Sequence, residues 1–152
     1  MVDQTITIGT LIHGTLRNED LLPAFADELG RVSGGAYAEL RDTAFRWATF
    51  LADNPGETVD PSGDHVGDIV PELSWEIQDA LQEYAPAHMY FGNIEGDGAD
   101  FGWWGVIDYD CETVQIDDEN VIDIECQVHI HTNDHGNVTV SELRGAVIWS
   151  AV

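Results

Sequence analysis

The chain has 152 residues, of which 29 are Asp or Glu and five are Arg, with no Lys, so its formal net charge is −24. Nucleic acids and anionic membranes both bind basic surfaces, so this charge excludes direct binding to either. The length is that of one domain and the apolar fraction of 43% is ordinary, which predicts a single acidic domain over residues 1–152.

The chain carries no pattern typical of membrane insertion or secretion. No apolar stretch approaches the roughly 18 residues of a membrane span, and the N-terminus lacks the basic and apolar regions of a secretory signal. We therefore expect a cytoplasmic protein, located in the host cell if a phage carries it. Cys111 and Cys126 are too few for a disulfide scaffold and are expected as small apolar side chains near a sheet, with their pairing left open.

The N-terminal third predicts a strand followed by two helices. Residues 4–12 alternate and are rich in β-branched types, which indicates a strand. Asn18 precedes two acids and predicts the start of a first helix that ends near Gly30. A second helix is expected over about 36–52, with Ser33 as its cap.

The middle of the chain predicts a loop and a third helix. Residues 54–66 are rich in Pro, Gly and Asp, which is typical of a loop. The third helix is expected over about 68–85, with Pro71 in its first turn and Pro86 just beyond its end.

The remaining chain predicts antiparallel sheet. The expected strands span residues 88–94, 101–108, 111–116, 124–132, 137–142 and 145–151. The segment NDHG at residues 133–136 predicts a hairpin turn. The predicted fold class is α+β, with an N-terminal strand, three helices and an antiparallel β-meander packed on the helices.

Acidic residues recur at helical spacing along the third predicted helix. They are Asp68, Glu72, Glu76, Asp79 and Glu83. At 100° per residue they share a strip about 80° wide, which we call the acidic strip. Like charges at i,i+4 destabilise a helix by about 0.2–0.5 kcal/mol per pair, and a solvated face normally mixes signs to avoid this. The strip is therefore a candidate binding surface.

A second group of acids lies in the sheet region. Asp108, Asp110 and Glu112 alternate with apolar residues, so an extended strand would place their carboxylates on one face about 6.6 Å apart. Asp117 and Asp118 follow without an intervening base. These five acids are further candidate partner-binding residues.

The adjacent residues Trp103 and Trp104 should point to opposite faces of a strand. We expect one in the core and consider Trp104 a candidate for the contact surface. Trp47 and Trp149 are expected in the core.

Two segments contain residues that could bind a metal ion. Glu95, Asp97 and Asp100 do not fit the spacing of the twelve-residue calcium loop, so a tight glycine-containing loop is favoured there. His129 and His131 share a strand face, with His135 in the following turn, but no Cys or carboxylate completes a standard spacing, so solvated histidines are favoured.

The chain contains no nucleophile elbow, phosphate-binding Gly loop or Cys/His dyad. We therefore predict neither an enzyme nor a metal or other cofactor.

Several segments resemble a family of uncharacterised small proteins from bacteria and their phages or plasmids. The resemblance is carried by TIGTL (7–11), EDLL (19–22), YFG (90–92), EGDGADFG (95–102), NDHGNVT (133–139) and IWS (148–150). The family has no known activity, so it implies no functional residues. Its members have a more ordinary charge balance, which implies that the acidity belongs to this protein and not to the fold.

The charge is comparable to that of a short DNA. Duplex DNA carries one charge per about 1.7 Å, so 24 charges match about 40 Å of duplex, which is about the span of a domain this long. We expect a mobile-element inhibitor that mimics DNA and blocks the nucleic-acid-binding channel of a host CRISPR or restriction complex. Its partner would be a basic nucleic-acid-binding protein or ribonucleoprotein, in an assembly of undetermined stoichiometry.

Two alternatives remain open. Absence of Lys and an excess of Asp (17) over Glu (12) also fit a salt-adapted accessory domain without a charge-driven partner. The weaker alternative is a metal-dependent enzyme that uses residues 95–100 or the His129/His131 pair.

Overall fold

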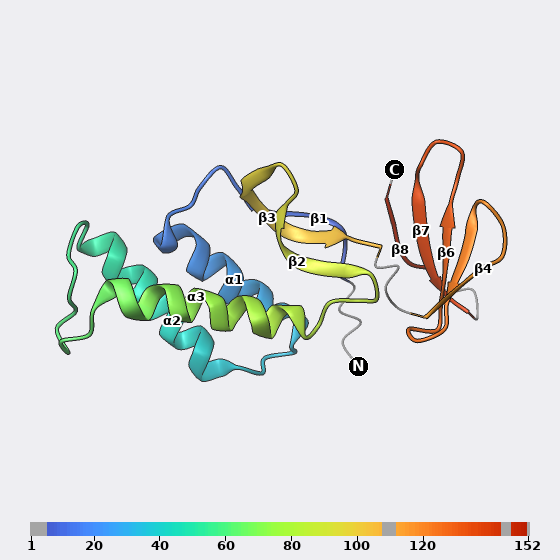
Figure 1. Cartoon of the computed structure of the whole chain (residues 1–152). Coiled ribbons are helices and arrows are strands. Elements are labelled where there is room, and N and C mark those ends of the chain that lie inside the picture. The colour runs from blue at the N-terminus through green and yellow to red at the C-terminus, as the bar shows by residue number, and fades with distance from the viewer. Residues whose placement is uncertain (1–5, 108–111, 144–146, 152) are drawn as a thin grey trace. The chain divides into compact units, whose positions relative to one another are not determined.

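The fold is that of a computed structural model, which describes residues 6–107, 112–143 and 147–151. Along these ranges the chain forms a strand, three helices and then a series of strands (Figure 1). The predicted α+β class and the order of its elements are confirmed.

The three helices lie close to their predicted ranges. They are α1 (Asn18–Val32), α2 (Ala38–Asp53) and α3 (Val66–Gln82). Helix α1 begins at Asn18 as predicted, and the other boundaries differ from the prediction by one to three residues. Pro71 lies two residues deeper in α3 than expected, in its second turn, because the helix begins at Val66.

Ser33 does not cap α2, so this prediction was wrong. Its backbone N–H donates to the carbonyl of Leu29 and closes the C-terminus of α1, while its hydroxyl donates to the carbonyl of Ala36. The residue before α2 is Tyr37, which adopts a left-handed conformation with φ 60°. Two glycines of the connection, Gly34 and Gly35, also have positive φ, so the chain reverses direction between the helices before α2 can begin.

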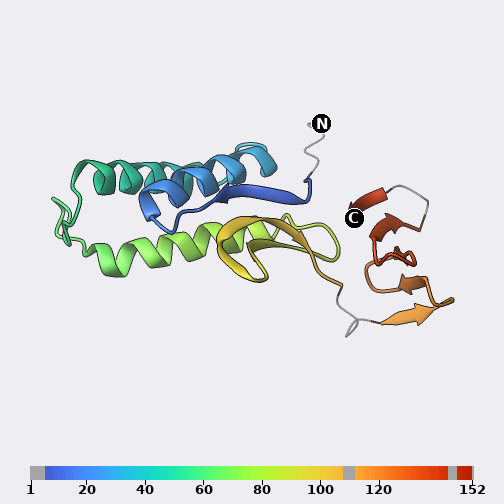
Figure 2. The same cartoon turned by 90° about the horizontal axis from the view of Figure 1, so that it is seen from above.

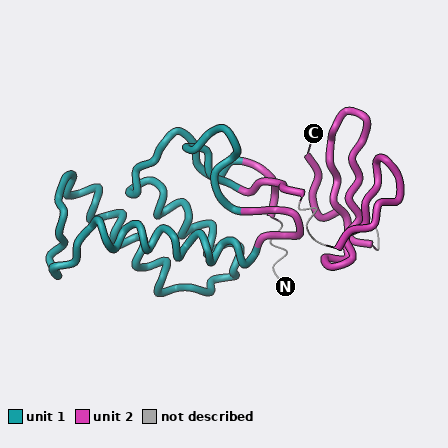
Figure 3. Tube along the Cα trace, viewed as in Figure 1, with its two compact units in different colours: residues 1–5, 10–84, 91–102 teal, residues 6–9, 85–90, 103–152 magenta. Residues whose placement is uncertain are grey.

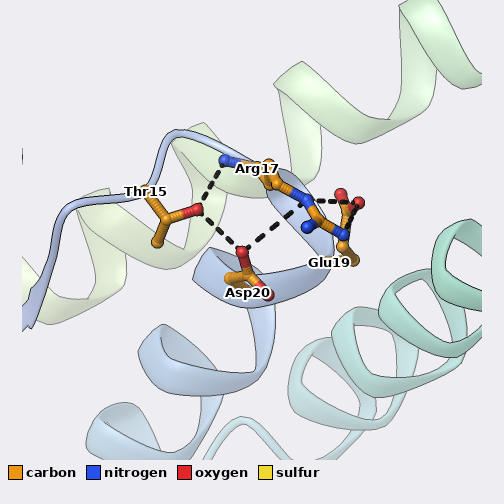
Figure 4. Close-up of polar contacts among 4 residues, drawn as sticks. All are labelled: Thr15, Arg17, Glu19 and Asp20. Atoms are coloured by element: carbon orange, nitrogen blue, oxygen red, sulfur yellow. Dashed lines mark hydrogen bonds and ion pairs between the residues drawn. The ribbon is translucent and has the colours of Figure 1, made fainter.

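The N-terminus of α1 holds a compact set of polar contacts (Figure 4). The hydroxyl of Thr15 donates to Asp20 Oδ2 over 2.7 Å and accepts the N–H of Arg17. The guanidinium of Arg17 binds Glu19 Oε1 through Nε and Nη2, at 2.8 and 2.7 Å. The acids in the first turn thus form ion pairs with Arg17 and also interact favourably with the positive end of the helix dipole.

The helices pack on one another: α1 contacts both α2 and α3, and α2 contacts α3 (Figure 2). Their largest fully buried side chains are Leu22, Phe25, Leu29, Trp47, Ile77 and Leu81. Phe25 also meets the edges of Phe91 and Phe101, with ring centroids 5.3 and 5.2 Å away. These aromatic contacts join α1 to the first sheet.

The first sheet has three strands in the order β1-β3-β2. Its strands are β1 (Gly9–His13), β2 (Met89–Ile94) and β3 (Asp97–Gly105). A tight turn at Glu95 and Gly96 joins β2 to β3, and Gly96 has φ 90°, so the predicted glycine-dependent loop is confirmed. The strand that follows begins at Asp97, four residues earlier than predicted.

The second sheet is an antiparallel meander in the order β4-β5-β6-β7-β8. Its strands are β4 (Thr113–Gln115), β5 (Asn120–Asp123), β6 (Val128–Thr132), β7 (Val138–Glu142) and β8 (Val147–Ala151). The predicted turn at residues 133–136 is confirmed by a hydrogen bond from the N–H of Gly136 to the carbonyl of Asn133.

The predicted continuous strand over residues 124–132 was wrong. Residues 124–127 form a turn, and a strand that we did not predict, β5, precedes it. The turn forms because the carboxylate of Asp123 accepts the backbone N–H of Cys126 over 2.9 Å, and Gln127 adopts φ 55°. A side-chain acceptor that competes with the sheet ladder breaks an otherwise β-like sequence.

The chain divides into two compact units (Figure 3). Unit 1 contains residues 1–5, 10–84 and 91–102, and unit 2 contains residues 6–9, 85–90 and 103–152. Unit 1 therefore holds the three helices, and unit 2 holds the meander. That the whole chain behaves as one domain stays a prediction.

Candidate functional site

All five residues of the acidic strip are solvent-exposed. Four lie on α3 and Glu83 immediately follows its last residue. The opposite face of the helix is buried in unit 1 through Val70, Leu73, Ile77, Ala80 and Leu81. Because this apolar face fixes the rotation of the helix, the acids are held outward as a group.

The spacing of the strip gives it a defined linear charge density. From Asp68 to Glu83 the helical rise amounts to about 22 Å, or about 5.6 Å between successive acids. A single strand of B-DNA carries one phosphate per about 3.4 Å of axis. The density of the strip is therefore within a factor of about two of that of a single strand.

The arginines of the described chain bind groups outside the strip. The ion pairs are Arg17 with Glu19 at 2.7 Å, Arg31 with Glu28 at 2.5 Å and Arg46 with Asp60 at 3.9 Å. Arg41 donates to the carbonyl of Ala26 over 2.8 Å. Within the described residues, the strip thus lacks a basic side chain in ion-pair contact.

Glu83 differs from the other strip residues because it accepts a hydrogen bond from the hydroxyl of Tyr37 over 2.6 Å. This bond raises the pKa of Tyr37, since it holds the phenolic proton between two oxygens. Glu83 therefore also ties the end of α3 to the start of α2.

Trp75 lies beside the strip and was missed by the sequence analysis. Its side chain is 69% exposed, and on the helix it lies about 20° from Asp68, outside the apolar face. It borders an open hollow of about 430 Å³ that is also lined by Asp79 and by Phe91 and Phe101 of the first sheet. Its position on the helical wheel, about 20° outside the edge of the acidic strip and away from the buried stripe, was the signal available in the sequence.

The second predicted group of acids is only partly within the described structure. Glu112, Asp117 and Asp118 are exposed, whereas Asp108 and Asp110 lie outside the described residues. Asp117 accepts hydrogen bonds from the side chain of Asn120 and from the N–H of Glu119, and these bonds lower its pKa. Asp117 thus stabilises the turn between β4 and β5.

The two adjacent tryptophans differ in burial as predicted. Trp103 is 3% exposed, and Trp104 is half-buried. Trp47 and Trp149 are buried as expected.

The histidines of β6 are more constrained than expected. His129 and His131 are half-buried, and each donates to the side-chain oxygen of Asn120, at 2.8 and 3.1 Å. The amide of Asn120 is oriented by its bond to Asp117. The prediction of solvated histidines was therefore wrong, while His135 is exposed in its turn.

Among the acids of residues 95–100, Asp97 has a local role. Asp97 accepts the N–H of Ala99 and lies 3.4 Å from His13 Nε2. Over the described ranges, a group of three convergent metal-ligating side chains occurs elsewhere, at His88, Asp123 and Cys126. The sequence analysis missed this group because His88 lies 35 residues before Asp123.

Among the described residues, no helix combines the length and the apolar character needed to cross a membrane. Comparison of the chain with models of protein families, with curated proteins and with solved structures found no match.

Proposed function

We propose that this protein is a mobile-element inhibitor that occupies the basic nucleic-acid-binding channel of a host defence complex, of the CRISPR or restriction type. The observation that carries the proposal is the acidic strip: five exposed carboxylates, four on α3 and one immediately after it, without a basic ion-pair partner among the described residues. Channels that hold nucleic acid are lined with basic residues and match such a row of charges.

The acidic strip destabilises the helix α3 that carries it. Three pairs of its acids stand at i,i+4, and each destabilises the helix by about 0.2–0.5 kcal/mol. The buried apolar face of α3 offsets this cost. A helix that keeps its charges unpaired is preorganised for a basic partner. No neutralising side chain must be displaced on binding, and no loop must become ordered.

Trp75 adds an anchor of a different kind. An exposed indole beside a carboxylate suits the guanidinium or ammonium group of a basic channel, through cation–π contact and charge attraction together. Tryptophan is also enriched among the residues that dominate interface energies.

A competition assay tests this function. The protein is added to a purified CRISPR effector and to a purified restriction enzyme, each bound to labelled target DNA, at a series of salt concentrations. We expect DNA to be displaced from one of them, with displacement weakening steeply as salt rises. Trp75→Ala should weaken displacement by about 2 kcal/mol, or roughly 30-fold, whereas Leu16→Ala, at the similarly exposed Leu16, should leave it unchanged. Failure to displace DNA from either complex would contradict the proposal.

The composition favours a second candidate function, that of a salt-adapted accessory domain. It rests on the absence of Lys and on the excess of Asp over Glu. At 1 M salt the Debye length is about 3 Å, so the repulsion among exposed acids is screened. Thermal unfolding at about 0.1 M and about 2 M salt separates the two candidates. The salt-adapted domain should be unfolded at the lower concentration and refold at the higher one, whereas the inhibitor should unfold cooperatively at both.

A further inference from the structure

Three side chains with metal-binding chemistry converge in unit 2. His88 lies just before β2, Asp123 ends β5, and Cys126 lies in the turn that follows. Their ligand atoms all lie within 4.8 Å of one another. The side chains of His88 and Asp123 are 2% and 0% exposed, and His88 Nε2 lies 2.6 Å from Asp123 Oδ2.

The surrounding structure holds two of these side chains in place. The backbone of His88 adopts φ 56°, and its carbonyl accepts the N–H of Val106 over 2.8 Å. The preceding carbonyl, that of Ala87, accepts the indole N–H of Trp149 over 2.8 Å. Asp123 uses Oδ1 to hold the turn through the N–H of Cys126, which leaves Oδ2 facing the imidazole.

The donor set selects a class of metal. An imidazole nitrogen, a carboxylate oxygen and a thiolate suit Zn²⁺ and similar transition-metal ions, whereas Ca²⁺ and Mg²⁺ prefer oxygen ligands alone. We propose that His88, Asp123 and Cys126 form a three-ligand site for a divalent transition-metal ion of the zinc type. Three protein ligands leave one position of a tetrahedral ion open to water or to another ligand.

Only a small rearrangement is required for binding. With metal–ligand distances of about 2.0–2.1 Å, tetrahedral geometry places nitrogen and oxygen about 3.3 Å apart. The His88 and Asp123 atoms would separate by less than about 1 Å, while the thiol would move inward. The bond from Asp123 Oδ1 to the turn would orient the carboxylate in the way that outer hydrogen bonds orient metal ligands.

The site also has an entry path. Cys126 is exposed and lines an open hollow of about 300 Å³ together with Gln127, Glu142 and Leu143. Glu142 adds a carboxylate to the wall of this hollow, and the net charge of −24 raises the local concentration of cations. A metal ion would thus reach the buried pair from the cysteine side.

Cobalt titration of the reduced, chelator-treated full chain tests the site. Thiolate ligation to Co²⁺ produces a near-ultraviolet charge-transfer band, and tetrahedral geometry intensifies the visible bands. We expect both at one equivalent of Co²⁺, with loss of both when Zn²⁺ is added. Carboxylates of the acidic surface bind Co²⁺ without a thiolate band, so they do not imitate this result.

Two cysteine variants decide which thiol is responsible. Cys126→Ser replaces an exposed side chain and should fold, yet it should lose the charge-transfer band. Cys111→Ser changes the other cysteine, outside the described residues, and should keep the band. Absence of a band in the wild type, its persistence in Cys126→Ser, or its loss in Cys111→Ser would each overturn the proposed site.

Discussion

Replacement of Glu72, Glu76 and Asp79 by lysine is expected to abolish displacement of DNA at protein concentrations where the wild type displaces it fully. Each substitution places a positive charge against a basic channel, and such like-charge contacts cost several kcal/mol in total. The three side chains are exposed on the middle of α3, so the apolar packing of the helix is unaffected. The measurement is the competition assay with labelled DNA.

The fold of this triple variant should be preserved. The lysine that replaces Glu72 would stand four residues after Asp68, and the lysine that replaces Asp79 would stand four residues before Glu83. Two repulsive pairs of the helix therefore become attractive. The melting temperature should stay level or rise slightly. Loss of displacement without loss of stability would assign the effect to the binding surface.

A matched control separates the strip from the total charge. Lysine at Asp42, Asp53 and Glu57 changes the net charge by the same amount, and these three acids are exposed at α2 and the loop after it. This control variant should displace DNA nearly as well as the wild type at physiological salt, where charges more than about 8 Å from the contact are screened. Equal loss in both triple variants would mean that net charge, and not the strip, determines inhibition.

Asp123→Ala is expected to lower the free energy of unfolding by about 3–5 kcal/mol, the range for removing one partner from a buried pair. The substitution leaves the imidazole of His88 buried without its carboxylate and also removes the acceptor for the N–H of Cys126. Since domains of this size are stable by only about 5–15 kcal/mol, the loss is a large share of the total. Urea unfolding in the presence of a chelator measures it without any contribution from metal.

Asp118→Ala is the control for this experiment, because Asp118 is exposed. Its replacement should change the free energy of unfolding by no more than about 0.5 kcal/mol. The double variant His88→Ala with Asp123→Ala should be less destabilised than the sum of the single variants, since the lost contact between the two side chains is counted only once and no imidazole is left buried without its carboxylate. A loss below about 1 kcal/mol for Asp123→Ala would show that the pair does not stabilise unit 2.

The stability of the His88–Asp123 pair and its proposed metal binding are separable. The pair is buried and hydrogen-bonded within the protein itself, so it can stabilise unit 2 as it stands. A metal ion would add stability by binding the folded state, by an amount that depends on its concentration and affinity. Chelator-treated and zinc-loaded samples of the same variant therefore report the two contributions independently.

The helices were predictable because their periodic apolar residues were sufficient to identify a buried face. In α3 the residues Leu73, Ile77 and Leu81 recur every four positions, which by itself indicates a buried stripe, and the outward direction of the acidic strip follows from it. The strand β5 was not predictable in the same way. Asn120–Asp123 is only four residues long and follows three acids, so its local sequence does not indicate a strand. Its extended conformation depends on pairing with β4 and β6.

The sequence by itself determined the charge, the α+β class and the side of α3 on which the acids stand, because these follow from composition and from short-range periodicity. Only the tertiary structure decided the hollow beside Trp75 and the meeting of His88 with Asp123 and Cys126. The physical reason is sequence separation: the His88–Asp123 contact spans 35 residues, and it depends on the turn after β5 and on the left-handed backbone of His88. Short-range sequence patterns therefore do not indicate which distant residues form such a contact.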